Sequence, residues 1–173
     1  MNGFIRGVKD TDPNCEVVYS YVGSFEDPAK AREIALAMIE SGVDVLQTDC
    51  GNSQIGVIEA AKEKGVLVSG DVADNSDMYP EGFFGFVGVE FGANVYEACR
   101  LLKEGSFPGG EHGYMNLENG GYYVPYETLE SFAERNPDYA DKMADAIKLS
   151  KDLTDQIIAG DLVIEFDTSV PEK

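Results

Sequence analysis

Two periods of hydrophobicity alternate along the first half of the chain. Three short apolar runs, rich in Val, Leu and Tyr and followed by Gly or polar residues, have the composition of β-strands. Between the first two, Ala31, Ile34, Ala35 and Met38 recur at the three- to four-residue spacing of a helix with one buried side. The strands are expected at 16–23, 43–47 and 66–70, and the helices at 27–41 and 54–64.

This order of elements predicts the fold class. Strand, helix, strand, helix, strand with connections of only a few residues is typical of right-handed βαβ units. We therefore expect an α/β fold, a three-layer parallel sheet with helices on both faces. The helix ends are also marked: Asp27 is an expected N-cap before Pro28, and Gly42 and Gly65 end the two helices.

The pattern is less regular after Gly70. A short apolar strand leads into a helix at 83–105, and the Asn119-Gly120-Gly121 sequence between two short apolar runs predicts a hairpin. The longest helix is expected at 136–160, with Ile147 on its buried side. Residues 3–10 have the pattern of the last turns of a helix, and residues 161–173 are expected to be extended.

Composition and charge narrow the possible partners. The chain has 173 residues, of which 43% are hydrophobic, and this is enough for a core. Its 32 acidic and 13 basic residues give a net charge of −19, which repels nucleic acid, acidic membrane surfaces and polyphosphates. Neutral or cationic small ligands remain. No run approaches the ~18 apolar residues that cross a bilayer.

Few side chains suit catalysis or metal binding. Cys15, Cys50 and Cys99 are widely spaced, which favours reduced thiols over a disulfide framework or a zinc site. The single histidine, His112, is expected to be an ordinary loop residue. We therefore expect no cofactor and no enzyme, while a hydrolase that uses paired carboxylates remains an alternative.

Polar loops follow the expected strands, at the edge where open parallel sheets bind ligands. These loops lack both the Lys-Ser/Thr of a P-loop and the G-x-G-x-x-G spacing, and their Asp residues would repel an anion. Carboxylates and amides instead suit hydrogen bonds to a polyol such as a sugar or the ribose of a nucleoside. The candidate ligand-binding residues are Asp49, Gly51, Asn52, Gln54, Asp71, Asp74 and Asn75.

Two other interpretations of these loops stay open. Asn52 and Asp27 are equally well explained as caps of the helices that follow them. A Ca²⁺ or Mg²⁺ site is the second, although the chain has no D-x-D-x-D-G frame.

Several longer stretches resemble a known family. "YVGSFEDPAK" (21–30) and "GVIEAAKEKGV" (56–66) are similar to motifs of the basic-membrane-protein (BMP) family of ABC-transporter substrate-binding lipoproteins, the PnrA-like group. That family carries Y-x-G-S-F-x-D-x-x-K and G-V-x-x-A-A-K-E-K-G. A weaker resemblance continues through "YEACRLLKEGSFPGG" (96–110), "GGYYVPY" (120–126) and "IIAGDL" (157–162).

The resemblance implies a type I periplasmic-binding-protein fold, in which two α/β lobes close on a ligand, with purine nucleosides as the best-known cargo. The chain would be an incomplete second lobe. Residues 1–83 would be its βαβαβ core, and 84–107 a crossover strand and helix that packs on the first lobe or a partner. Residues 108–173 would return to the second lobe. The first lobe, a lipobox cysteine and the lobe's opening strand are expected before Met1, in an extracytoplasmic lipoprotein.

The chain departs from the family motifs at several positions. Ile58 stands where the family has an aromatic residue that stacks on the base, and Asn52 and Gln54 stand at glycine positions. Asp74 matches the second Asp of the family's G-V-D-x-D-Q, whereas Val72 stands at its hydroxyl-binding first Asp. Asp71 would replace that Asp if the strand end shifted by one residue. The family's lysine, which would align near 89–90, is absent.

Two functional hypotheses follow. The first is a non-enzymatic, ligand-binding portion of a solute-binding protein that serves an ABC permease and binds a nucleoside or another small polyol. The second is a stand-alone regulatory or assembly module without a transport ligand. In either case a strand is expected to be missing between 16–22 and 43–48, where a separate partner, a swapped homodimer or another local arrangement would fill the gap.

Overall fold

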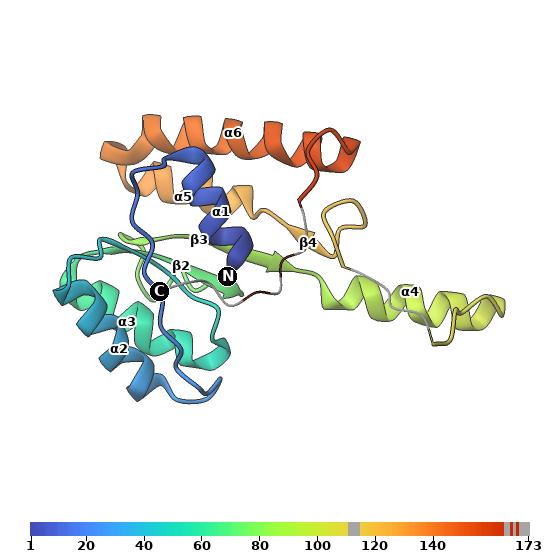
Figure 1. Ribbon diagram of the computed structural model, residues 1–173, viewed down its shortest axis with the longest axis horizontal. Coiled ribbons are helices and arrows are strands. Elements are labelled where there is room, and N and C mark those ends of the chain that lie inside the picture. The colour runs from blue at the N-terminus through green and yellow to red at the C-terminus, as the bar shows by residue number, and fades with distance from the viewer. Residues whose placement is uncertain (111–114, 165–166, 168, 170–173) are drawn as a thin grey trace.

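A four-stranded sheet forms the centre of the fold (Figure 1). The computed structural model describes residues 1–110, 115–164, 167 and 169. The strands follow one another across the sheet in chain order; the first three are parallel, and the last is antiparallel to its neighbour. They are β1 (Val45–Gln47), β2 (Leu67–Val72), β3 (Phe83–Val89) and β4 (Tyr122–Tyr123).

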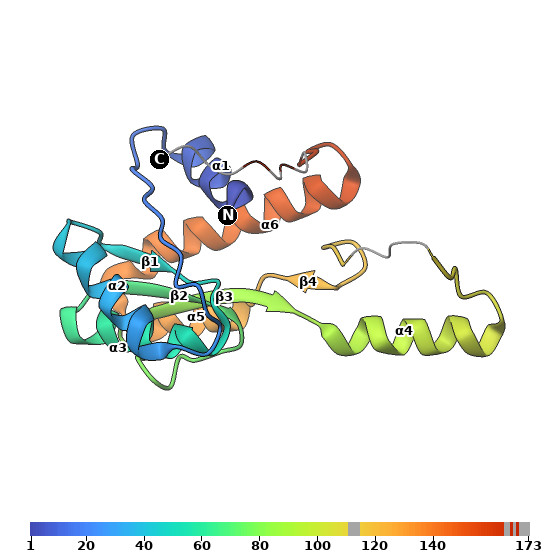
Figure 2. The ribbon, with the colours of Figure 1, turned by 60° about the horizontal axis from the view of Figure 1, so that its bottom comes forward.

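Helices cover both faces of this sheet (Figures 1 and 2). On one face α2 (Pro28–Glu40) packs along α3 (Gln54–Lys64), which contacts β2. On the other face α5 (Tyr126–Arg135) contacts β3 and packs against α6 (Ala140–Ala159), with the short 3-10 turn η2 (Pro137–Tyr139) between them. The predicted α/β class with three layers is confirmed.

The ends of α2 and α3 agree with their sequence signals. The backbone N–H of Lys30 donates to Asp27 Oδ1 at 3.0 Å, so Asp27 caps α2 as predicted. The 3-10 turn η1 (Gly51–Ser53) leads into α3, which ends at Gly65. Gly65 has a φ of +73°, a left-handed conformation that glycine adopts without a Cβ clash.

The main core lies between the sheet and the helices α2 and α3. Apolar positions that recur at helical spacing on α3 meet the inward side chains of β2 and β3. Burying a large aliphatic or aromatic side chain contributes about 1.5–3 kcal/mol, so this group supplies much of the driving force for folding. The core side chains with no exposed surface are Ile58, Ala60, Ala61, Val68 and Phe83.

The predicted strand at 16–23 is wrong. The segment pairs with no strand in the described part of the chain, and β1 is the outermost strand at one edge of the sheet. Its Val- and Tyr-rich sequence suits a pleated surface, but a strand forms only where a neighbouring backbone supplies hydrogen bonds. The sequence pattern therefore indicates a preference for strand conformation, but no neighbouring strand among the described residues pairs with this segment.

The predicted hairpin around Asn119 is also wrong in its pairing. Tyr122 and Tyr123 pair with Val89 and Gly88 at the end of β3. Across the turn the Tyr122 N–H donates to the Asn116 carbonyl at 3.0 Å, but the described residues just before the turn form no strand. His112 lies outside the described residues.

Helix α5 has no counterpart among the predicted elements. It begins after Pro125 and buries Thr128 and Phe132, which are four residues apart. The helix predicted at 136–160 is confirmed as η2 followed by α6, and Ile147 is its buried residue.

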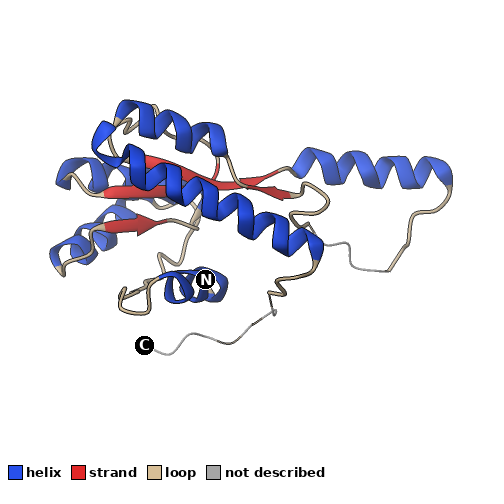
Figure 3. Cartoon of the chain, turned by 90° about the horizontal axis from the view of Figure 1, so that it is seen from above, coloured by secondary structure: helices blue, strands red, loops and turns tan. Residues whose placement is uncertain are grey.

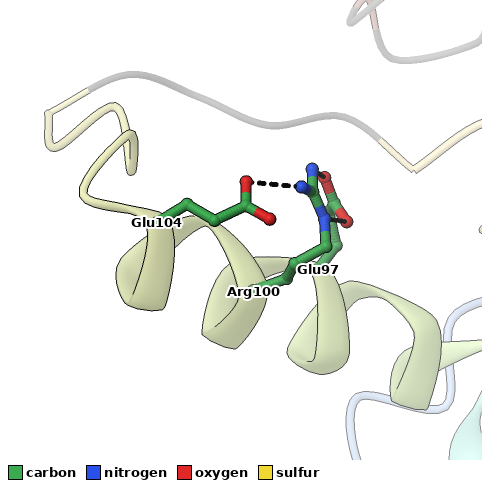
Figure 4. Close-up of polar contacts among 3 residues, drawn as sticks. All are labelled: Glu97, Arg100 and Glu104. Carbon is green, nitrogen blue, oxygen red and sulfur yellow. Dashed lines mark hydrogen bonds and ion pairs between the residues drawn. The ribbon is translucent and has the colours of Figure 1, made fainter.

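Helix α4 (Phe91–Glu104) extends away from the rest of the molecule and buries none of its residues (Figure 1). Ion pairs within the helix stabilise it, because Arg100 donates to Glu97 Oε1 and Glu104 Oε2, both at 2.6 Å (Figure 4). These pairs, three and four residues apart, favour the helical conformation. The proposed role of 84–107 in packing on another lobe stays a prediction.

Helix α1 (Asn2–Thr11) also buries no residue. Figures 1 and 2 place it on the side of the sheet that α6 occupies, and Figure 3 shows it beyond the short outermost strand. Across the described residues, none of the helices combines the length and the hydropathy that a membrane span requires.

Candidate functional site

The loops after β1 and β2 meet at the carboxyl edge of the sheet. The backbone N–H of Gly51 donates to Asp71 Oδ2 at 3.0 Å. The Gln54 side chain bonds to the backbone of Asp71. Asp71 N–H donates to Gln54 Oε1 at 3.2 Å, and Gln54 Nε2 donates to the Asp71 carbonyl at 3.4 Å. The structure therefore brings three of the predicted site residues, Gly51, Gln54 and Asp71, into one group.

Asp71 has one carboxylate oxygen that its surroundings do not satisfy. The side chain is only 6% exposed, and within the described residues no donor reaches the buried Oδ1. Leaving a buried acceptor without a donor costs about 1–3 kcal/mol, so such atoms are rare in folded proteins. Asp71 Oδ1 is therefore a buried acceptor at a strand end that no donor of the described residues satisfies.

The backbone after Asp71 is strained. Val72 has a φ of +58°, and Ala73 N–H donates to the Asp71 carbonyl at 2.5 Å to close a three-residue turn. A left-handed conformation is unfavourable for a β-branched residue, by about 1–3 kcal/mol, and such strain concentrates at binding and catalytic sites. The strain coincides with the unsatisfied carboxylate, which strengthens the case for a functional site here.

An exposed aromatic side chain lies next to this group. Phe25 is 69% exposed, and a Cβ placed on Gly51 would be 3.3 Å from its Cδ1. Gly51 has a φ of +57°, so both its conformation and the nearness of Phe25 favour glycine. Phe25 was not among the predicted site residues; an aromatic residue in a polar strand-end loop is the signal that would have found it.

Ser53 fixes the loop that carries Phe25. Its backbone N–H donates to the Phe25 carbonyl at 3.1 Å, its hydroxyl donates to the Ser24 carbonyl at 3.0 Å, and Asp27 N–H donates to that hydroxyl at 2.8 Å. Ser53 is completely buried. The position of Phe25 is therefore determined by the same short turn that positions Gly51.

Ile58 does not lie at the site. Its side chain is fully buried in the core. The expectation that this position corresponds to a base-stacking residue is therefore not supported by its placement, and the available aromatic surface beside Gly51 belongs to Phe25.

The remaining predicted residues have other contacts. Asn52 Nδ2 donates to both carboxylate oxygens of Glu26, at 2.9 and 3.0 Å, and the cap of α3 has no side-chain hydrogen bond, so Asn52 is not its cap. Asp49 is exposed. Asn75 Nδ2 donates to the Ala73 carbonyl at 3.3 Å, which is a contact within its own loop. A role for these residues in binding stays a prediction.

Asp74 ties its loop to α5. Thr128 Oγ1 donates to Asp74 Oδ2 at 2.9 Å, and Ser76 N–H donates to Oδ1 at 2.8 Å. Burial by itself would raise the pKa of Asp74, but these hydrogen bonds and the charge of Arg135 lower it below its usual value. Asp74 thus stays ionised and serves to hold the 73–77 loop in place.

Cys50 lies between two carboxylates and is expected to react slowly. Burial, followed by the negative charges of Asp71 and Asp49, raises the pKa of its thiol to about 11. Its thiolate fraction at pH 8 is then about one-hundredth that of an ordinary thiol, with alkylation slowed accordingly. We expect Asp71→Asn to speed the reaction, because it removes one of the two charges.

Iodoacetamide labelling followed by peptide mass spectrometry at pH 7–10 measures this effect. The exposed Cys15 and Cys99 are internal controls in the same chain. Labelling of Cys50 as fast as that of Cys15 at pH 8 would contradict the prediction.

No metal site accompanies this group. The described residues contain no cluster of three or more His, Cys, Asp or Glu side chains placed to hold an ion. The arrangement offers a carboxylate, that of Asp71, which accepts hydrogen bonds, and an aromatic ring, that of Phe25, in the neighbouring loop.

Comparisons with known proteins identify the family. A model of the family described as "ABC transporter substrate-binding protein PnrA-like" matches residues 1–161. The chain belongs to this family. The resemblance noted in its motifs is therefore confirmed, and the family is one of binding proteins.

Curated relatives of this family member are longer than the chain. Basic membrane protein D of Borreliella burgdorferi (strain JD1) is 30% identical over 91% of this chain and 46% of its own length. The ABC transporter nucleoside-binding protein BmpA of Lactococcus lactis subsp. cremoris is 33% identical over 69% of this chain and 39% of its own. The chain thus spans less than half the length of these relatives.

A solved structure supports the fold of the family. The ABC transporter solute-binding protein of Aeropyrum pernix K1 matches 95% of this chain with a TM-score of 0.72, at 22% sequence identity. The match covers 52% of that protein. The fold is therefore that of part of a solute-binding protein, as the motifs imply.

Proposed function

We propose that the group around Asp71 forms one wall of a binding site for an uncharged, hydroxyl-bearing molecule of the nucleoside or sugar type. The observation that carries this proposal is the buried Asp71 Oδ1 without a donor. An ionised carboxylate accepts hydrogen bonds only, and a ligand hydroxyl is a donor of suitable size. The net charge of −19 favours a neutral ligand over an anionic one.

Phe25 gives this wall an apolar surface for a planar ring. A base that stacks on an aromatic side chain while its ribose donates to a carboxylate would use both features at once. Both lie next to Gly51, since the Gly51 N–H donates to Asp71 and Phe25 lies beside the Gly51 Cα. A nucleoside therefore suits the arrangement better than a simple sugar does.

The relatives agree with this assignment. The Lactococcus relative is named a nucleoside-binding protein of an ABC transporter, and the family as a whole is one of substrate-binding proteins rather than enzymes. In this proposal the chain contributes to an extracytoplasmic, lipid-anchored receptor. The family's first lobe would close the cleft, and an ABC permease would accept the ligand.

The exchange of Asp71 for asparagine tests the site. Because one wall provides only part of the contacts, we expect a Kd on the order of 1 mM for the isolated chain, which ¹H–¹⁵N correlation spectra detect well. Titration with inosine, adenosine, uridine and ribose should shift the amide signals of Gly51 and Gly70. Asp71→Asn should weaken binding by about ten-fold or more, since it places a donor where the ligand needs an acceptor.

Asp77→Asn is the matched control, because Asp77 is an exposed carboxylate of the loop that follows β2. It should bind like the unmodified chain. Asp71→Asn should also raise the stability of the free protein, since it removes a buried charge without a full set of donors. Flat titrations with every ligand, or equal binding by both variants, would refute the proposed site.

The alternative of a regulatory or assembly module predicts a different outcome. If it is correct, the titrations cause no shifts of the amide signals, and light scattering shows a tight dimer of the chain. Saturable shifts at Gly51 and Gly70 would decide against it.

A further inference from the structure

The connection between β2 and β3 is short for its topology. These neighbouring strands are parallel, and residues 73–82 join them without a helix. Parallel strands usually need a crossover of about a dozen residues or more, most often a helix. Because this crossover loop lacks the regular hydrogen bonds of a helix, contacts with neighbouring elements must fix its course.

The half of the crossover loop next to β3 has several anchors. Lys62 Nζ, on α3, donates to the Met78 carbonyl at 2.8 Å. Arg135 Nε, on α5, donates to the Pro80 carbonyl at 3.3 Å. The Tyr79 side chain is buried in the main core. This half is therefore held by two helices and by the core.

The half next to β2 depends on Thr128. Thr128 Oγ1 donates to Asp74 Oδ2 at 2.9 Å, and within the described part of the chain no other hydrogen bond joins residues 73–77 to a helix. The helix α5 that carries Thr128 is itself close to the sheet, because a Cβ placed on Gly85 of β3 would be 2.9 Å from Leu129 Cδ2. The Thr128 hydroxyl thus gives this half a well-fixed point of attachment.

The strained turn after β2 lies between two anchors. The Gln54 side chain bonds to the backbone N–H and carbonyl of Asp71, which precedes Val72. Asp74, which is bonded to Thr128, lies on the other side of Val72. A β-branched residue keeps a left-handed conformation only where the surrounding structure enforces it. Loss of the Thr128 anchor should therefore let Val72 return to an extended conformation.

We propose that Thr128 is a positioning residue of the candidate site. Through Asp74 it holds the turn in the conformation that keeps Asp71 Oδ1 buried and without a donor until a ligand hydroxyl reaches it. Without this bond the turn relaxes and water reaches Oδ1. A ligand must then displace that water, so its affinity falls. This role rests on the proposed function, since it concerns the affinity for the same nucleoside-type ligand.

Substitutions at both ends of the bond test this role. Thr128→Val keeps the shape of the side chain without its hydroxyl, Asp74→Ala removes the acceptor from the exposed partner, and Thr128→Ser retains the bond. A positive φ brings the amide and α protons of a residue close together, so the intraresidue nuclear Overhauser effect of Val72 reports the turn in the ligand-free chain. This signal should be strong in the unmodified chain and in Thr128→Ser, and weak in the other two variants.

Titration with inosine measures the consequence for binding. Thr128→Val should raise the Kd by about five-fold or more, and Thr128→Ser should restore it. Thr154→Val is the matched control, because it removes a hydroxyl that lies 3.4 Å from Tyr126 Oη, between α5 and α6. It should change neither the Val72 signal nor the Kd.

A strong Val72 signal in both Thr128→Val and Asp74→Ala would overturn the proposal, as would equal weakening of binding by Thr128→Val and Thr154→Val. A weakened Val72 signal with an unchanged Kd would show that Thr128 orders the loop only, and would overturn its role in binding. If the unmodified chain bound no nucleoside, the proposed function would fail, whereas the Val72 signals would still decide whether Thr128 holds the turn.

Discussion

Replacing Gly56 by alanine should destabilise the protein by about 3–5 kcal/mol, one of the two largest effects we expect from a single substitution. A Cβ at this position would lie 1.9 Å from the Pro28 carbonyl oxygen and 3.0 Å from the Arg32 nitrogen. Both are backbone atoms of α2, so no side chain can rotate away to make room. The helices α2 and α3 would have to separate, and their shared core would open.

This separation would also disturb the candidate site. The loop that carries Phe25 leads directly into α2, and Ser53, which fixes that loop, lies just before α3. Gly7→Ala is the matched control, because Gly7 is inside α1 and a Cβ there would meet nothing within 4 Å. Urea unfolding followed by circular dichroism compares the two. A loss below ~1 kcal/mol for Gly56→Ala would contradict the expected clash.

The first half of the fold could be predicted because its local signals agree with one another. Asp27 caps a helix whose apolar positions recur at helical spacing, and Gly65 ends the next helix in the left-handed conformation. Each signal depends on residues within one or two turns. The pairing of 16–23 depends on a neighbouring strand, and the part of the chain that the structure describes places none beside it; no local pattern contains that information.

The candidate site could be predicted only in part. Asp71 and Gln54 were recognisable as polar residues at strand ends, and the structure brings them together. That Asp71 Oδ1 lacks a donor, and that Val72 has a positive φ, are properties of the folded chain. Ile58 shows the limit of motif matching: it follows Gln54 by one helical turn within an apolar face, and that periodicity indicates the core.

The second large effect is expected for Phe83→Ala, which should cost about 3–5 kcal/mol of stability. Phe83 has no exposed surface, and its ring lies against Gly70, where an added Cβ would be 2.9 Å from Cζ. The cavity left by the ring would therefore lie directly beside the strand end that carries Asp71. Water that enters there would supply the donor that Oδ1 lacks in the intact protein.

Phe83→Ala thus links the core to the proposed function. We expect it to weaken nucleoside binding even under conditions where the variant remains folded, and to speed hydrogen exchange at the Asp71 amide. Val87→Ala on the same strand is the control, because Val87 is 47% exposed and should cost less than ~1 kcal/mol. Phe83→Ala could instead lower stability but leave binding and hydrogen exchange at Asp71 unchanged. That result would show that the ring serves only the core, and that Gln54 is enough to position the Asp71 backbone.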